Sequence, residues 1–346
     1  MAEPDNTIDA DTRREVVANI ATTLESFYVF PEVAQRMSAE LKAAGTGAYD
    51  DLTTPDALCG RLTADLQAIS HDKHLRVRYN IEPQAVTSVG EHSPEEEAEW
   101  AAQGRIANFG FRKVERLDGN IGHLDLRGFW EASLPGAGET AVAAMNLLSH
   151  TDALIVDLRQ NGGGAPSMIA LLSSFLFKAK PVHLNSFYER NGDKMSQSWT
   201  LPYIPGPRTP DKPAYVLTSS RTFSAAEEFT YNLKNLKRAT IVGETTGGGA
   251  HPGGDIAVTP HYRIFVPTGR AINPISGTNW EGTGVEPDVS VPQEQALDCA
   301  YRLALEIVLE KLGDATSRTA KSQAEEARAA LADLSARSSA ARIAGV

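Results

Sequence analysis

Between residues 8 and 83, apolar residues recur every three or four positions, which predicts amphipathic helices. Three such stretches follow one another, and Pro31 suits the first turn of the second. The positions that carry the pattern are Val16, Val17, Ile20, Leu24, Phe27, Val33, Met37, Leu41, Leu58, Leu62, Leu66 and Ile69. We therefore expect a small helical domain over residues 8–83.

The period of the pattern changes at residue 106. Two alternating segments flank an Asp118–Gly119 turn and predict a β-hairpin. The uninterrupted apolar run "ALIVDL", residues 153–158, is typical of a parallel strand that is covered on both faces. Helix-like and strand-like segments alternate after it, which predicts an α/β domain with crossover connections over residues 106–312.

Two further segments flank this α/β domain. Residues 84–105 are rich in glutamate and predict a linker with an acidic helix. Residues 313–346 consist largely of alanine, serine, arginine and glutamate, with few large apolar residues. We expect them to form a helix-prone tail at the surface.

The 346-residue chain has 33 basic and 44 acidic residues, which gives a formal net charge of −11. This balance argues against a nucleic-acid partner, because such a partner needs a basic surface. No apolar run approaches the ~20 residues of a membrane helix, and the acidic start lacks the features of a signal peptide. Cys59 and Cys299 have no metal-type spacing and predict reduced thiols. We expect a cytoplasmic protein, unless an export signal has been trimmed from the chain.

The stretch "SSRTFSAAEEF" places Ser224 at the start of a predicted helix. Ser224 and Glu227 have the spacing of a capping box, in which the serine only satisfies backbone N–H groups. The same position suits a nucleophile, because the free amides and the positive end of the helix dipole stabilise an oxyanion. The local pattern alone favours the cap, and both interpretations stay open.

The segment "DLRQNGGG", residues 157–164, joins the apolar strand to the next helix. It lacks the glycine order of a phosphate-binding loop. Its glycines form either a tight turn or a wall of backbone amides that faces Ser224. Because ligands collect at the carboxyl ends of strands in open α/β sheets, we expect the loops after residues 158, 218 and 243 to share one edge.

A serine nucleophile needs a base, and the chain has eight histidines. Those in predicted loops are His71 and His74 in "SHDKH" and His251 after a triple glycine. His71 and His74 with Asp72 lack an apparent third ligand, so no metal and no cofactor is expected. Glu281 in "NWEGTGVEPDV" is either an orienting carboxylate or a turn residue.

Several motifs in order resemble the tail-specific (C-terminal processing) protease family, which includes the tricorn proteases and the repeats of interphotoreceptor retinoid-binding protein. These motifs are "ALIVDLRQNGGG", "TSSRTFSAAEEF", "RATIVGETTGGG" and "GTGVEPDVSV". The segments "FYVFPE", "ISHDKHLRV", "IGHLDLRGF" and "GETTGGGAHP" resemble the retinoid-binding-protein-like branch. The resemblance covers about residues 10–312. It implies a helical N-terminal domain and a ββα-spiral core related to ClpP and crotonase.

The resemblance also implies roles for individual residues. Ser224 corresponds to the nucleophile, and the amides of Ala225 and Gly163 correspond to the oxyanion donors, with Gly164 as the alternative. The lysine that tail-specific proteases use as base corresponds here to Gly249, which rules out a serine–lysine dyad. The peptide-binding PDZ domain of those proteases does not fit into the short segment between "LRVRY" and the first core strand.

The resemblance to tricorn proteases implies a different base, a histidine in place of the lysine. Their histidine lies between the helical domain and the core and corresponds to His74. Their glutamate precedes a "G-x-x-P-D" motif and corresponds to Glu281. The resemblance therefore implies a Ser224–His74–Glu281 triad, and His251, close to the lysine position, is the competing base.

These residues predict a serine hydrolase, above all a peptidase or amidase that forms an acyl-enzyme. One alternative is a non-catalytic carrier for an apolar small molecule such as a retinoid or fatty acid. The other is a small-molecule acyl hydrolase or transferase that uses the same site. The expected partner is a peptide or a small apolar acyl substrate, with no nucleic acid or membrane, and assembly into a homo-oligomer stays open.

Overall fold

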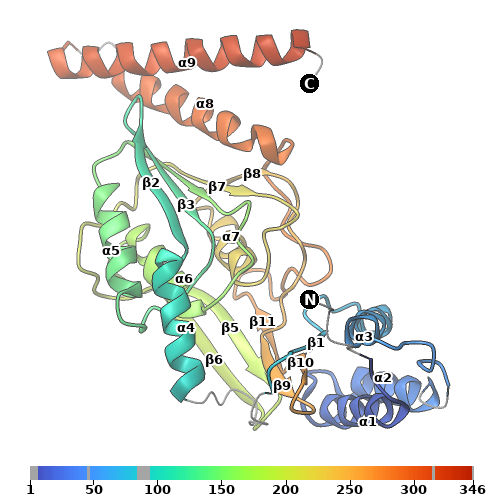
Figure 1. The fold of residues 1–346 in the computed structure, drawn as a ribbon. Coiled ribbons are helices and arrows are strands. Elements are labelled where there is room, and N and C mark those ends of the chain that lie inside the picture. The colour runs from blue at the N-terminus through green and yellow to red at the C-terminus, as the bar shows by residue number, and fades with distance from the viewer. Residues whose placement is uncertain (1–6, 45–46, 84–93, 314–315, 345–346) are drawn as a thin grey trace. The chain divides into compact units, whose positions relative to one another are not determined.

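The computed structural model of the chain describes residues 7–44, 47–83, 94–313 and 316–344 (Figure 1). The chain divides into two compact units, each discontinuous in sequence. The first unit consists of Met1–Ala98, Ser186–Gln197 and Gly249–Ile272, and the second of Glu99–Asn185, Ser198–Gly248 and Asn273–Val346. The domain boundaries expected from the sequence stay predictions.

Helices form the N-terminal part of the first unit, as the spacing of apolar residues predicts. They are α1 (Ala10–Phe27), α2 (Pro31–Ala44) and α3 (Pro55–Ser70). Asp9 caps α1 by accepting the Thr12 N–H at 2.7 Å. Ile20, Leu24 and Leu62, which lie on the predicted apolar faces, are fully buried in one shared core. The predicted helical N-terminal region is thereby confirmed.

Two three-stranded sheets complete the first unit. One has the antiparallel order β1 (Arg76–Tyr79), β10 (Tyr262–Pro267) and β9 (Gly253–Ala257). The other has the order β11 (Gly269–Ile272), β5 (His183–Glu189) and β6 (Lys194–Trp199). The first three residues of β5 and the last two of β6 are counted with the second unit.

A six-stranded mixed sheet forms the centre of the second unit (Figure 1). Its order is β12 (Val289–Ser290), β8 (Thr240–Gly243), β7 (Ala214–Thr218), β4 (Ala153–Asp157), β3 (Ile121–Leu126) and β2 (Phe111–Leu117). Only β2 pairs antiparallel, through the hairpin that the Asp118–Gly119 turn predicts. The other pairings are parallel, which requires the predicted crossover connections.

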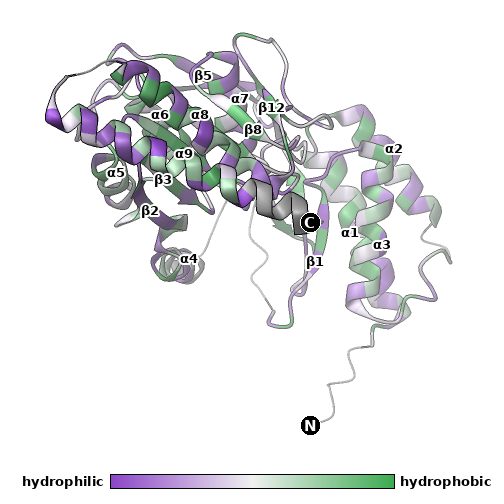
Figure 2. Cartoon of the chain, turned by 90° about the horizontal axis from the view of Figure 1, so that it is seen from above, coloured by the Kyte–Doolittle hydropathy of each residue, from purple (hydrophilic) through white to green (hydrophobic). Residues whose placement is uncertain are grey.

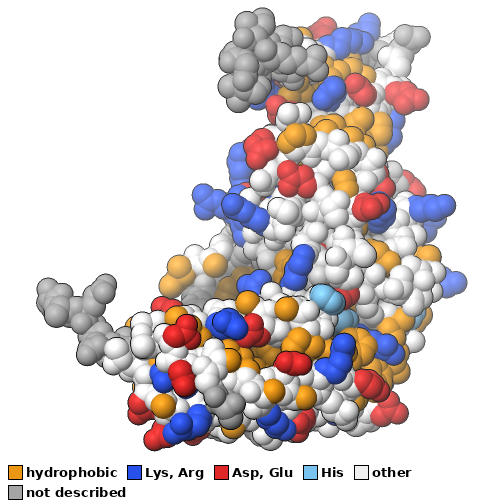
Figure 3. Space-filling model, turned by 90° about the vertical axis from the view of Figure 1, so that its right-hand side faces the viewer, with side chains coloured by type: hydrophobic (Ala, Val, Ile, Leu, Met, Phe, Trp, Pro, Cys, Tyr) orange, Lys and Arg blue, Asp and Glu red, His pale blue; other side chains and the backbone are white. Residues whose placement is uncertain are grey.

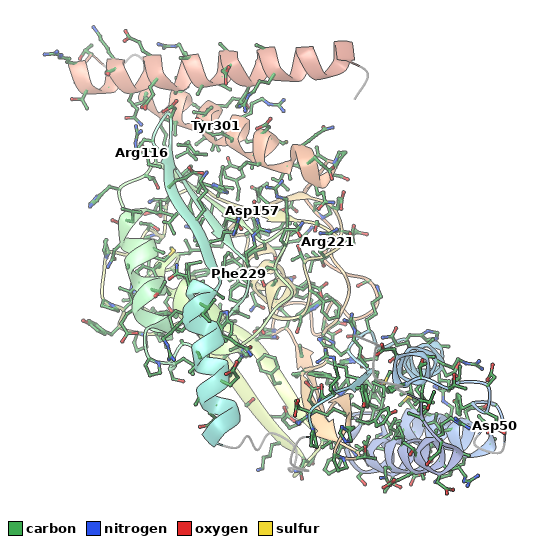
Figure 4. All side chains as sticks on the ribbon, viewed as in Figure 1. Asp50, Arg116, Asp157, Arg221, Phe229 and Tyr301 are labelled. Atoms are coloured by element: carbon green, nitrogen blue, oxygen red, sulfur yellow. The ribbon has the colours of Figure 1, made fainter. Side chains whose placement is uncertain are left out.

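Both faces of this sheet are covered by helices. Residues 94–344 form the helices α4 (Pro94–Ile106), α5 (Ala137–Leu147), α6 (Pro166–Phe175), α7 (Ala225–Asn235), α8 (Gln293–Leu312) and α9 (Arg318–Ala344), and a short 3-10 helix spans Asn108–Gly110. Helices α5, α6 and α7 share a core with one face of the sheet, and α8 shares a core with the other. Leu154 and Val156 of β4 join the core that contains Phe229 of α7, which Figure 4 labels. Ile155 joins the core that contains Leu305 of α8. Successive residues of this strand are thus buried on opposite faces of the sheet, which explains why the run at 153–158 is apolar at every position. The helix-covered sheet confirms the predicted α/β class.

The C-terminal tail is anchored by a row of small and apolar residues. Helix α9 packs on α8, beside which it lies in Figure 2. Ala327 and Leu334 are buried in their shared core. Basic and acidic side chains are interspersed over the face that Figure 3 presents. Within the described residues, no helix has the length and apolar character needed to cross a bilayer.

The turn after β4 depends on one glycine. Gly164 has φ 135°, and a Cβ at this position would lie 1.9 Å from the Phe129 carbonyl oxygen. That oxygen accepts the Ala165 N–H at 2.6 Å, and the Phe129 N–H donates to the Gly163 carbonyl at 2.8 Å. A side chain at 164 therefore has no room without breaking this backbone pairing.

We predict that Gly164→Ala destabilises the protein by at least about 2 kcal/mol, because it combines a disfavoured φ with a backbone clash. The melting temperature should fall by roughly 4–8 °C in a thermal-shift measurement. Gly162→Ala is the matched control, since nothing lies within 4 Å of a Cβ at that glycine. Equal melting temperatures for the two variants would show that the turn does not constrain the fold.

Candidate active site

Ser224 stands at the start of α7 in an unusual backbone conformation. Its φ is 56° and its ψ is −121°, whereas an N-cap residue normally has extended dihedrals. A non-glycine residue in such a region costs on the order of 1–3 kcal/mol and persists only where its surroundings enforce it. A serine on a sharp strand-to-helix turn is the arrangement that projects a nucleophile. The observed strain therefore favours the nucleophile interpretation over the simple cap.

The Glu227 carboxylate enforces this conformation. Its Oε2 accepts the Ser224 N–H at 2.8 Å, which is the glutamate half of the predicted capping box. Its Oε1 accepts the Thr246 hydroxyl at 2.5 Å and the Gly248 N–H at 2.6 Å. Glu227 is 0% exposed, so these charge-assisted bonds form away from water. One buried carboxylate thus joins the serine turn to the glycine-rich loop after β8.

Gly163 lies against the serine. A Cβ on Gly163 would lie 2.7 Å from the Ser224 Cβ and 2.9 Å from the Ala225 nitrogen, so only glycine fits. The Gly163 N–H donates to the Asn161 Oδ1 at 2.9 Å. Within the described part of the chain the Ala225 N–H, the first of the helix, donates no hydrogen bond. In this conformation the Ala225 amide, one of the expected oxyanion donors, is open, whereas the Gly163 amide is engaged by Asn161.

Asn161 holds this glycine wall in place. It is fully buried, and its Nδ2 donates to the Leu126 carbonyl at the end of β3 at 3.0 Å. Its own carbonyl accepts the Phe223 N–H at 3.1 Å, next to the serine. Gly164, the alternative oxyanion residue, pairs with Phe129 in a parallel bridge. The predicted wall of glycines and the serine turn are therefore parts of one hydrogen-bonded structure.

Glu281 lies in the second unit, in the loop between β11 and β12. Its N–H donates to the Asn279 side chain at 2.9 Å. The same loop is tied to the glycine-rich loop, because the Gly282 N–H donates to the Gly248 carbonyl at 3.1 Å and the Val285 N–H donates to the Thr246 hydroxyl at 2.7 Å. Gly248 and Thr246 both contact Glu227, so Glu281 is anchored to the structure that holds the serine.

The two candidate bases lie in the first unit, beside Asp72. The Asp72 Oδ2 lies 2.7 Å from the His251 Nδ1 and accepts the Tyr28 hydroxyl at 3.3 Å. The Asp72 Oδ1 accepts the His74 backbone N–H at 3.0 Å and lies 3.9 Å from the His74 Nδ1. Asp72 is 1% exposed. One buried carboxylate thus faces both imidazoles and forms a short contact with that of His251.

The His74 imidazole is held in its neutral form. Burial lowers its pKa to about 4, although the nearby Asp72 carboxylate acts in the opposite direction. Its ring stacks on Phe265 with centroids 5.6 Å apart. A neutral imidazole can accept a proton, but a pKa this low also makes His74 a weaker base than an ordinary histidine, because burial disfavours its charged form.

The structure groups the predicted site residues by unit. Ser224, Ala225, Gly163, Gly164 and Glu281 all belong to the second unit and share its loops. The candidate bases, the histidines at 74 and 251, belong to the first. Sequence reasoning overlooked the pairing of the aspartate at 72 with the histidine at 251, because these residues are far apart in the chain. It also overlooked the buried asparagine at 161, for which "QNGGG" gives no distinguishing signal.

A second acidic residue of α7 is buried one turn after the serine. Glu228 is 3% exposed, and burial raises its pKa to about 8, although the side chains of Asn185 and Asn232 oppose the shift. The Asn232 Oδ1 accepts the Asn273 amide at 3.1 Å. The Asn273 Oδ1 in turn accepts the Ile275 N–H at 3.0 Å, in the loop that leads to Glu281. Glu228 therefore lies beside the buried asparagines that connect α7 to this loop.

Comparisons with known proteins agree with this architecture. Residues 120–291 match peptidase family S41, and residues 11–108 match the N-terminal domain of peptidase S41 in eukaryotic IRBP, the interphotoreceptor retinoid-binding protein. The chain is 29% identical over 182 residues to a carboxy-terminal-processing protease of Bartonella bacilliformis. That match covers 51% of this chain but only 40% of the curated relative.

Solved structures share the fold at low sequence identity. A lipoprotein from Streptococcus agalactiae superposes with a TM-score of 0.56 at 16% identity, covering 85% of this chain and 96% of that one. The photosystem II D1 C-terminal processing protease gives a TM-score of 0.51 at 14% identity, covering 82% and 94%. The matched segments and the shared fold define an α/β protein of the peptidase type. The chain belongs to peptidase family S41.

The buried Glu228 makes stability depend on pH. Its folded pKa lies above the ordinary value of 4.5, so between about pH 4.5 and pH 8 the folded protein keeps a proton that the unfolded chain releases. Stability should therefore fall as the pH rises through this window. We predict that Glu228→Gln removes this loss and melts on the order of 5 °C above wild type at pH 8, while the two converge near pH 5.

Thermal melts of both proteins across this pH range measure the effect. Glu310→Gln, which removes an exposed carboxyl from α8, serves as the control and should follow the wild-type profile. A constant difference between Glu228→Gln and wild type at every pH would mean that Glu228 does not titrate in this window.

Proposed function

We propose that the protein is a serine peptidase that cleaves its substrate through an acyl-enzyme on Ser224. The observation that carries this proposal is the strained Ser224 conformation beside an open Ala225 N–H. The family membership and the relative's description as a carboxy-terminal-processing protease support it. A polypeptide is accordingly the proposed substrate. We also retain the relation of the core to the ClpP and crotonase spiral as a proposal, supported by the mixed sheet between helices.

The proposed chemistry follows from the groups at the serine. The Ser224 Oγ attacks the substrate carbonyl carbon while a histidine takes the hydroxyl proton. The carbonyl oxygen becomes an oxyanion that accepts the Ala225 N–H at the positive end of α7. The C–N bond then breaks, and the histidine returns the proton to the leaving amine. A water molecule then attacks the ester carbonyl carbon while the histidine takes one of its protons. The bond between the acyl carbon and the Ser224 Oγ breaks, the histidine returns the proton to that oxygen, and the acid leaves.

His74 is the proposed base, with Glu281 as the carboxylate that orients it and stabilises its charged form. Burial disfavours the charged imidazole of His74, and a partner carboxylate such as Glu281 would offset that cost during the reaction. His251 is the competing base, and the contact between its Nδ1 and Asp72 favours this assignment. A carboxylate at Nδ1 fixes the tautomer that leaves Nε2 basic, as in other serine peptidases. The two assignments differ in which carboxylate completes the triad.

A fluorophosphonate probe tests the proposal, because it phosphonylates only an activated serine. Wild type should be labelled and Ser224→Ala should not. Ser220→Ala, an exposed serine of the same loop, is the matched control and should be labelled as wild type is. His74→Ala should label at least about 100-fold more slowly if His74 is the base, and His251→Ala should show the larger loss if the assignment is reversed.

Two outcomes would contradict the proposal. Equal labelling of wild type and Ser224→Ala would exclude Ser224 as the nucleophile. No labelling of folded wild type would favour a non-catalytic carrier for an apolar small molecule, which needs no activated serine. Peptide mapping by mass spectrometry locates the modified residue in each case.

A further inference from the structure

Three aromatic side chains gather beside the glycine wall in the second unit. Trp130 follows β3, and its ring lies 5.5 Å from that of Trp100 on α4 and 6.5 Å from that of Phe109. Gly104 of α4 permits this approach, because a Cβ there would lie 3.0 Å from the Trp130 ring. We call Trp100 and Trp130 the tryptophan pair.

The tryptophan pair is not part of a closed core. Trp100 is 43% exposed, and Trp130 is only partly buried at the margin of the core. Two neighbouring indoles form a contiguous apolar surface, and such surfaces mark interaction or ligand-binding sites, where tryptophan is enriched. The position of the pair therefore suggests a surface that a ligand completes.

Backbone bonds connect this pair to the serine. Gly128 lies between the two features, because a Cβ on it would be 3.7 Å from the Trp130 Nε1 and 3.9 Å from the Gly163 carbonyl oxygen. The Phe129 N–H, next to Trp130, donates to that same carbonyl at 2.8 Å. On its other side, Gly163 contacts the Ser224 Cβ. The indole and the nucleophile therefore flank one glycine.

We propose that the tryptophan pair binds an apolar, preferably aromatic, side chain on the substrate residue that carries the scissile carbonyl. This inference rests on the proposed peptidase function. The scissile carbonyl would lie at Ser224 and the Ala225 N–H, and the side chain of its own residue begins one carbon away. That side chain is consequently the part of the substrate best placed to reach across Gly163. An aromatic ring stacked on an indole buries apolar surface and adopts a favourable ring–ring geometry, and both stabilise the bound substrate.

The exposed Glu99 and the half-buried Glu131 lie next to Trp100 and Trp130 in the chain. Their carboxylates disfavour an acidic side chain at this position. They do not supply the buried, paired carboxylate that a dedicated site for a basic side chain requires, since neither is buried. An apolar side chain is thus the class that the surroundings of the pair favour.

Peptidyl diphenyl phosphonates that differ in one side chain test the inference. The Ser224 Oγ attacks phosphorus, phenol leaves with the proton, and the rate of adduct formation is measured by mass spectrometry. Wild type should react at least about tenfold faster with the phenylalanine analogue than with the alanine analogue. Trp130→Ala and Trp100→Ala should each reduce this ratio, the former by about tenfold.

Trp199→Ala is the matched control. Trp199 is also 43% exposed but stacks on His183, with centroids 4.5 Å apart. This variant should keep the wild-type ratio. Trp130→Phe keeps a ring and should give an intermediate ratio, and thermal melts confirm folding. If Trp130→Ala does not fold, the exposed Trp100→Ala decides the test.

The outcomes separate this inference from the function on which it rests. Labelling of Ser224 with a ratio that neither tryptophan variant changes would overturn the inference and leave the peptidase proposal intact. A faster reaction with the lysine analogue than with the phenylalanine analogue would also overturn it. No labelling of wild type by any analogue would contradict the peptidase proposal itself, and the tryptophan pair would lose its role with it.

Discussion

The buried Glu227 carboxylate is the interaction on which the rest of the site depends. It accepts hydrogen bonds from the Ser224 N–H, the Thr246 hydroxyl and the Gly248 N–H, at the N-terminus of its own helix. A buried carboxylate is tolerated only when its lone pairs are satisfied, and a helix N-terminus favours its charge. The site therefore gains rigidity, because loosening any one of these loops would remove a hydrogen bond from a buried charge.

The arrangement of the sheet explains why these loops meet. The glycine wall follows β4, the serine turn follows β7 and the glycine-rich loop follows β8. These strands are parallel neighbours, so their carboxyl ends reach one edge, where a ligand can lie against backbone amides. The helix that follows β7 then directs its free first amide, that of Ala225, toward the same edge. A strained serine and an open amide result from ordinary parallel topology, together with one carboxylate that fixes the turn.

Much of this fold follows directly from the chain. The helical period before residue 83 arises because each helix buries a single face. The apolar run at 153–158 is unbroken because its strand is buried on both faces. The capping-box spacing of Ser224 and Glu227 is likewise visible in the sequence. The strained conformation of Ser224 is not visible there, because it arises from the hydrogen bonds that Glu227 forms to a loop after another strand.

The parts that sequence reasoning could not supply are long-range. Asp72 and His251 come together only in the folded first unit, and no local pattern links them. The engagement of the Gly163 N–H by Asn161 is equally a matter of loop conformation. Likewise, the ring contact between Trp100 and Trp130 depends on Gly104 of α4 approaching the turn after β3. Motif order identified the family, but the chemistry of each residue is set by its neighbours in space.

The most direct measurement of this account is the rate of fluorophosphonate labelling at Ser224 in a Glu227→Gln variant. The substitution preserves shape but replaces one acceptor oxygen with an NH₂ group and removes the charge, so it cannot accept all three hydrogen bonds. The account predicts a folded protein whose Ser224 reacts at least about tenfold more slowly than in wild type, because the strained turn relaxes. A folded variant that reacts at the wild-type rate would contradict the claim that this carboxylate holds the nucleophile.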